Sequence, residues 1–69
     1  MRVILNGEER EVPERITVAE LVNRAGIADS RRRGMAIAVD AEVVPRSAWE
    51  GTELLEGQKV ELVSAIQGG

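Results

Sequence analysis

Two adjacent glycines, Gly68 and Gly69, follow Gln67 at the carboxyl end of the chain, and they offer the clearest route to chemistry. Because glycine has no Cβ, a Gly-Gly segment is narrow and reaches backbone angles that are closed to other residues. Such a tail can enter a tight channel and bring a terminal carboxylate to another protein's active site. A carboxylate is a poor electrophile, so acyl chemistry at Gly69 requires activation, which we expect as an acyl-adenylate. A frayed tail without a function is the alternative interpretation.

The side chains offer little chemistry of their own, because the 69 residues include neither cysteine nor histidine. This composition excludes thiol nucleophiles, Cys/His zinc sites and His-containing triads. The glycines match no phosphate-binding motif. Glu8, Glu9 and Glu11 are close carboxylates, but we interpret them as a solvated strand edge because catalytic acids need a cleft that shifts their pKa. We therefore expect that this chain is not itself an enzyme and that it binds no metal and no cofactor.

The overall charge argues against nucleic acid as a partner. The formal net charge is -3 and the isoelectric point is about 4.9, whereas nucleic-acid binding usually shows as a basic footprint. The apolar run Val3–Leu5 is far too short for a membrane span or a signal peptide. We expect one small domain that is cytoplasmic, does not contact membranes and is a monomer when free.

The elements that must hold this tail begin with a predicted β-hairpin. Asn6-Gly7 is the strongest short-range hairpin signal, because both central positions of a type I′ turn need a positive φ. Strands are therefore predicted at residues 2–6 and from residue 8 to about residue 12. The second strand is highly charged, so we place it at a sheet edge, where charge deters unwanted pairing.

A helix is predicted to follow the hairpin. Thr17 and Glu20 have the spacing of a capping box, in which two side chains satisfy amides at the start of a helix. Gly26 is expected to end the helix in a left-handed conformation. Four apolar residues share the face that should pack on the sheet: Val18, Leu21, Val22 and Ala25.

The second half of the chain predicts another pair of strands. Residues 29–34, with three arginines, are interpreted as a solvated loop in preference to an anion site. Met35–Asp40 alternates like a central strand, and Glu42–Val44 returns from it. The type of the turn between them is open, because Ala41 tolerates a positive φ poorly.

A short capped turn is predicted next, from Ser47 to Gly51. Ser47 and Glu50 have the Ser-x-x-Glu spacing of a second capping box. Trp49 is the only aromatic residue of the chain, and we favour a core position for it over a docking role.

The last strand follows a turn at Glu56-Gly57 and leads directly to the tail. Val60 and Leu62 share one face of it, and Glu61, Val63 and Ala65 face the other way. Together the elements predict an α+β fold, a four- to five-stranded sheet with one main helix packed across one face.

Several of these fragments, taken in order, resemble the ThiS family of sulfur carriers in thiamine biosynthesis. The resemblance covers nearly the whole chain, including its length, and includes the following segments: Asn6-Gly7, Thr17–Leu21, Val44–Ser47 with Trp49, Thr52 and Leu54, then Gly57, Val60–Val63 and Gln67-Gly68-Gly69. The chain departs from the family pattern at two turns: Asp40-Ala41 replaces Asn-Gly, and Gln58 replaces a common Asp.

This resemblance implies a β-grasp, ubiquitin-like fold with a mixed sheet, in which the first and last strands are parallel neighbours at the centre. It implies a folded domain at residues 1–66 and a flexible tail at residues 67–69. It also implies that an E1-like, ThiF-type adenylyltransferase uses ATP to adenylate Gly69. Sulfur from a cysteine desulfurase persulfide would then give a thiocarboxylate, which donates sulfur to a ThiG-type thiazole synthase.

The resemblance also implies which residues meet partners. Gly69 matches the family's reactive residue, and Gly68 matches the narrow residue before it. Ile66 and Gln67 match the part of the tail that enters the partner. From the strand pattern we add the outward residues Val63 and Ala65 as partner contacts. We also predict that Arg46 binds a partner, because it follows Pro45 at an exposed strand end.

Three other functions remain open at this stage. The small subunit of molybdopterin synthase, or a carrier for another sulfur pathway, would share the Gly-Gly end and would differ in its partner. A conjugated modifier would end in an isopeptide bond, and heavier covalent adducts would reveal it. A plain interaction module would keep its partner binding after loss of Gly68 and Gly69.

Overall fold

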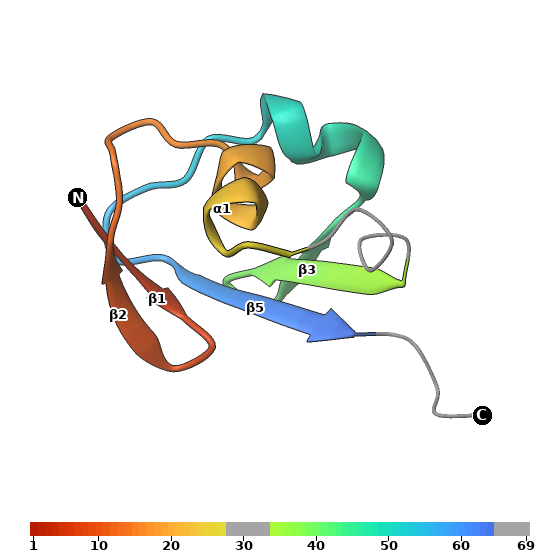
Figure 1. The fold of residues 1–69 in the computed structure, drawn as a ribbon, viewed down its shortest axis with the longest axis horizontal. Helices are drawn as coiled ribbons and strands as arrows, with labels where there is room; N and C mark the ends of the chain where they lie inside the picture. The colour runs from red at the N-terminus through yellow and green to blue at the C-terminus, as the bar shows by residue number, and fades with distance from the viewer. Residues whose placement is uncertain (28–33, 65–69) are drawn as a thin grey trace.

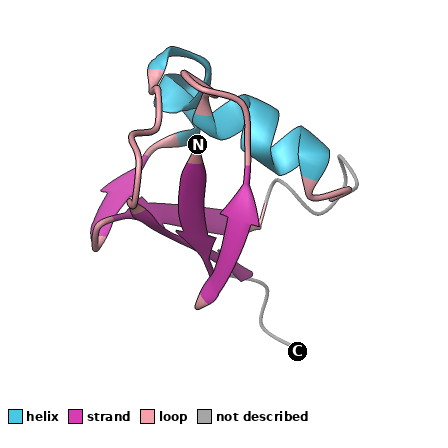
Figure 2. Cartoon of the chain, turned by 90° about the vertical axis from the view of Figure 1, so that its left-hand side faces the viewer, coloured by secondary structure: helices cyan, strands magenta, loops and turns pink. Residues whose placement is uncertain are grey.

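One mixed sheet and two short helices make up the part of the chain that the computed structural model describes, residues 1–27 and 34–64 (Figure 1). The helices cover one face of the sheet, and the other face is open (Figure 2). This arrangement confirms the predicted α+β architecture, with five strands. The elements are β1 (Arg2–Leu5), β2 (Glu8–Glu11), α1 (Val18–Arg24), β3 (Met35–Val39), β4 (Glu42–Val44), the 3₁₀ helix η1 (Arg46–Gly51) and β5 (Lys59–Ser64).

The last strand, β5, joins two hairpins into one sheet. The strand order is β2-β1-β5-β3-β4, so each hairpin meets the rest of the sheet only at β5. β5 runs parallel to β1, with Leu5 opposite Val60, and antiparallel to β3, with Met35 opposite Ser64. The predicted parallel pairing of the first and last strands at the sheet centre is therefore confirmed.

The turn between β1 and β2 is the one that the sequence predicts. Asn6 and Gly7 have φ values of 50° and 84°, as a type I′ turn requires. The side-chain Oδ1 of Asn6 also accepts a hydrogen bond from the backbone N–H of Leu62, at 2.9 Å, and so ties the hairpin to β5. All four residues of β2 are exposed at the sheet edge, which confirms the charged edge strand.

Helix α1 begins at the predicted capping box. The Thr17 hydroxyl accepts a hydrogen bond from the Glu20 N–H at 3.1 Å, and the Glu20 carboxylate accepts one from the Thr17 N–H at 3.0 Å. Gly26 has a φ of 74° just after the helix, as predicted. The prediction for Ala25 was wrong: this residue is exposed, because it is the C-cap residue, beyond the last turn that packs on the sheet.

The turn between β3 and β4 has positive φ at two residues that are not glycine. Asp40 and Ala41 have φ values of 51° and 70°. The Asp40 carboxylate accepts hydrogen bonds from the Lys59 N–H at 3.0 Å and from the Gln58 side-chain amide at 3.2 Å. These bonds hold the turn against the start of β5, which explains why this strained conformation is stable.

The second predicted helix start was wrong by two residues and in its mechanism: the N-cap is Pro45, not Ser47. Helix η1 begins at Arg46, directly after Pro45, and no side chain caps it. Ser47 therefore lies inside the helix, because the extended Pro45 already turns the chain out of β4. The core position of Trp49 is confirmed: 5% of it is exposed, and its indole N–H donates to the Val44 carbonyl at 2.9 Å.

The hydrophobic core lies between the sheet and the two helices. No polar or charged residue is buried in the described part of the chain. The core is built from β-branched and leucine side chains around the single tryptophan. Its fully buried members are Val3, Val18, Val22, Ile37, Leu54 and Val60.

Candidate functional site

The candidate site begins where β5 ends. β5 is paired on one side with β1 and on the other with β3, and its last residue, Ser64, lies opposite Met35, the first residue of β3. Residues 65–69 lie outside the described part of the chain. This range contains five predicted site residues and the predicted boundary between residues 66 and 67, and those predictions stand untested: Ala65, Ile66, Gln67, Gly68 and Gly69.

The outward face of β5 carries the predicted contact residue Val63. Its exposed fraction is 54%, whereas Val60, on the inner face, is completely buried. Val63 pairs with the small residue Ala36 on β3. At the far edge of this open face Val43 is 69% exposed. The sheet therefore presents apolar side chains to solvent close to the point where the tail leaves.

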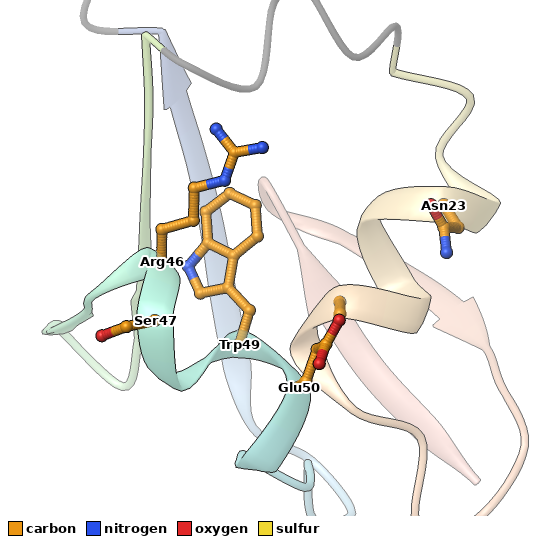
Figure 3. Close-up of a pocket in the computed structure, with 6 residues that line it drawn as sticks. Asn23, Arg46, Ser47, Trp49 and Glu50 are labelled. Atoms are coloured by element: carbon orange, nitrogen blue, oxygen red, sulfur yellow. The ribbon is translucent and has the colours of Figure 1, made fainter.

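Arg46 lies on the other side of the sheet, in the helical layer. Its guanidinium carbon lies 5.7 Å from the centroid of the Trp49 ring, within the range of a cation–π contact. The two residues line a shallow cleft of about 350 Å³ between η1 and α1 (Figure 3). Asn23 of α1 lies on the other side of this cleft, and Glu50 of η1 also lines it.

The sequence analysis predicted Arg46 and Trp49 separately and missed that they form a pair. A signal for it was available, because residues three apart are eclipsed in a 3₁₀ helix, which has three residues per turn. Recognising it required knowing that residues 46–51 form a 3₁₀ helix.

The described side chains include no candidate metal site and no buried acid or base. Within residues 1–27 and 34–64, no cluster of three or more His, Cys, Asp or Glu residues could hold a metal ion. The carboxylates of β2 are exposed, and Glu9 and Glu11 pair with Arg2 at 3.6 and 3.9 Å. Acid–base chemistry thus has no buried, convergent groups in this part of the chain. In the same residues, no helix is long and apolar enough to cross a membrane.

Comparison with solved structures confirms the β-grasp fold. The crystal structure of the thiamine biosynthesis protein ThiS from Geobacter metallireducens superposes with a TM-score of 0.83, at 27% identity and with all of both chains covered. The solution structure of a thiamine biosynthesis protein from the same organism gives a TM-score of 0.77, also at 27% identity, covering all of this chain and 88% of the other.

Sequence comparison agrees with the structural likeness. A thiazole synthase from Paramagnetospirillum magneticum is 36% identical over all 69 residues, although the chain spans only 20% of the length of that protein. The sulfur carrier protein ThiS of Escherichia coli is 29% identical, and the match covers all of both chains. A profile of the ThiS family matches residues 3–69. The chain therefore belongs to the ThiS family, together with a sulfur carrier protein and a thiamine biosynthesis protein.

Proposed function

We propose that this chain is a protein co-substrate that carries sulfur as a thiocarboxylate on Gly69, for synthesis of the thiazole ring of thiamine. The observation that carries the proposal is the extent of the family match, which runs from residue 3 to residue 69 and so includes both tail glycines. The lack of convergent acid–base groups in the described body supports the same view, since the chemistry is left to the tail and to partner enzymes.

The first step is activation of the Gly69 carboxylate. A carboxylate oxygen attacks the α-phosphorus of ATP, the bond to the β-phosphate bridging oxygen breaks, and pyrophosphate leaves with that electron pair. The product is an acyl-adenylate, which is electrophilic at the carbonyl carbon. ATP belongs to the partner adenylyltransferase, of the ThiF type, and this chain binds no cofactor itself.

The second step replaces oxygen by sulfur. A persulfide anion on a cysteine desulfurase or another donor attacks the activated carbonyl carbon, and AMP leaves. A thiol then attacks the donor's cysteine sulfur in the resulting acyl disulfide. The thiol and the donor form a new disulfide, and the Gly69 thiocarboxylate is released. Thiazole synthase, of the ThiG type, then takes the sulfur.

Thiazole synthase is the acceptor that the comparisons favour. One protein of that name contains a stretch similar to this entire chain. A carrier and its acceptor must meet at every turnover, and a shared chain would keep them together. Exposed Val63, with Ala65 after it, is the surface that we assign to these encounters, since it adjoins the tail that enters the partner.

The intact mass of the untagged protein from its own cells tests the proposal. We expect a fraction heavier by the difference between sulfur and oxygen, and expect deletion of Gly69 to abolish it. Gly51→Ala is a matched control, since a Cβ at Gly51 meets no atom within 4 Å and the backbone there has no positive φ. This variant should keep the heavier fraction.

Two results would contradict the carrier role, and a third would contradict the pathway. A mass that stays unmodified after incubation with ATP, a sulfur donor and the cognate adenylyltransferase would show that the tail is not activated. Covalent adducts with lysines of other proteins would instead identify a conjugated modifier. If the thiocarboxylate forms but sulfur passes to a molybdopterin synthase large subunit and not to thiazole synthase, the carrier role stands and the pathway is wrong.

A further inference from the structure

We propose that Arg46, held over Trp49, binds a carboxylate on the rim of the partner active site that receives the tail. This inference rests on the proposed function, because it assumes that a partner enzyme takes Gly69 into its active site. It adds a specific contact outside the tail and assigns the chemistry of the group that meets it.

The strand register places Arg46 at the end of the molecule from which the tail leaves. Val44 lies opposite Ile37, and Ile37 lies opposite Leu62 on β5. Two residues further along, β5 ends at Ser64 and β4 has passed through Pro45 to Arg46. The start of η1 and the end of β5 accordingly lie toward the same side of the molecule (Figure 1).

The length of the tail keeps its partner close to this end of the molecule. Five residues follow Ser64, and a fully extended chain of that length spans at most about 17 Å. β5 and β4 are separated by two strand spacings, which is about 10 Å. An enzyme that holds the Gly69 carboxylate in its active site can therefore bring the rim of that site within reach of β5, β3 and the start of η1.

The pairing with Trp49 holds Arg46 ready for such a contact. The indole is buried and fixed by its hydrogen bond to the Val44 carbonyl, and the guanidinium lies over it at 5.7 Å. An arginine that is already ordered loses less conformational entropy when it binds. Among the described residues no carboxylate pairs with Arg46, so its charge is available to a partner.

A protein carboxylate is the group that best fits this position. The planar guanidinium binds carboxylates and phosphates in a two-pronged manner. The phosphate of the adenylate is attached to Gly69 itself, inside the partner, whereas Arg46 stays on the folded body at the rim. Glu50, which also lines the cleft, disfavours a free multivalent anion inside it (Figure 3). A single Asp or Glu from the partner, approaching from the Arg46 side, avoids this repulsion.

The test measures adenylation by the cognate adenylyltransferase as pyrophosphate release, at varied concentrations of the carrier. For Arg46→Ala we expect the KM for the carrier to rise about tenfold, as for an arginine that contributes measurably to an interface, with kcat unchanged. Arg46→Lys should show a smaller rise, because an ammonium group cannot form the two-pronged contact. Added salt should reduce the difference in the KM for the carrier between the wild type and Arg46→Ala, because it screens the interaction between charges.

Arg15→Ala is the matched control, because it removes the same charge from an exposed site. The segment between β2 and α1 that contains Arg15 lies on the other side of the molecule from the end of β5 (Figure 1). If both variants leave the KM for the carrier unchanged while the wild type is adenylated, the Arg46 proposal is wrong and the carrier function stands. If Arg46→Ala changes the KM for ATP instead, Arg46 contacts phosphate and the proposal is also wrong. If the wild type is never adenylated, the proposed function fails and this inference falls with it.

A charge exchange gives the strongest positive result. Arg46→Glu should bind the partner worse than Arg46→Ala, because it places like charges opposite each other. Changing one rim Asp or Glu of the partner to Lys should then restore the KM for Arg46→Glu and weaken binding of the wild-type carrier. If no rim substitution restores the KM for Arg46→Glu, the group that Arg46 binds is not a carboxylate on the rim, and the proposal is wrong. Far-ultraviolet circular dichroism of each variant verifies that the fold is intact.

Discussion

Replacing Asp40 by alanine should destabilise the protein by about 2 kcal/mol, although the side chain is exposed. The Asp40 carboxylate accepts hydrogen bonds from the Lys59 N–H and the Gln58 amide, and so fastens the β3–β4 turn to the start of β5. Its backbone also has a φ of 51°, a left-handed conformation that aspartate tolerates better than alanine.

The magnitude is the sum of two effects. Loss of the hydrogen bonds to a charged acceptor should cost about 1 kcal/mol at this solvent-exposed site. The left-handed conformation should cost alanine about 1 kcal/mol more than aspartate. Asp40→Asn keeps one acceptor oxygen and the tolerance for positive φ, so it should lose only about 0.5 kcal/mol.

Urea denaturation followed by tryptophan fluorescence is the appropriate assay. Trp49 is the only aromatic residue and is buried, so its emission reports the unfolding of the whole core. With a denaturant slope of about 1 kcal/mol/M for a domain of this size, the midpoint for Asp40→Ala should fall by roughly 2 M. Glu42→Ala is the control, since the structure gives that exposed carboxylate no hydrogen bond or ion pair with another described residue.

Two results would refute this reasoning. If Asp40→Ala lowers the free energy of unfolding no more than Glu42→Ala does, the hydrogen bonds from Asp40 contribute nothing measurable. If Asp40→Asn is as unstable as Asp40→Ala, the negative charge matters and the backbone conformation does not.

Two further substitutions test the local structure, and both are measured by the same urea titration. Ala41→Gly should raise the free energy of unfolding by about 0.5 kcal/mol, because relief of the strain at a φ of 70° exceeds the entropy that glycine loses on folding; a loss of stability would show that Ala41 is not strained. Thr17→Ala should lower it by about 1 kcal/mol by removing the cap of α1, whereas Thr17→Ser should keep nearly all of it; equal losses would assign the effect to the methyl group.

The sequence predicted the parts of the fold that depend on neighbouring residues. The turn at Asn6-Gly7 and the cap at Thr17 and Glu20 involve residues at most three positions apart, and their chemistry allows few other structures. The parallel pairing of β1 and β5 joins residues more than fifty positions apart. It was predicted from the family resemblance, because periodicity alone cannot assign pairs of strands.

Hydrogen bonds between a side chain and the backbone of a residue far away in the chain could not be predicted from the sequence. Asp40 and Lys59 are nineteen positions apart, and only the folded sheet brings them together. The sequence therefore left the β3–β4 turn undecided, even though the hydrogen bonds of Asp40 stabilise it. The start of η1 was misplaced for a different reason: Ser47 had the spacing of a capping box, but Pro45 had already set the direction of the chain.

For the candidate site, the sequence located the residues but not their arrangement. It predicted that Val63 faces away from the core, and the exposure of this residue agrees. It proposed Arg46 from exposure alone, whereas the structure adds the buried indole beneath it and the cleft beside it.

The place of β5 in the sheet also governs how the chain is made. A ribosome synthesises β1 to β4 before β5, but the two hairpins are joined in the sheet only through β5. Isolated two-stranded hairpins are at best marginally stable in water. A nascent or truncated chain that lacks β5 thus has two unconnected ribbons and an open core. The sheet can therefore form only after β5 has been synthesised. A folded molecule is one whose synthesis has reached the residues directly before the tail.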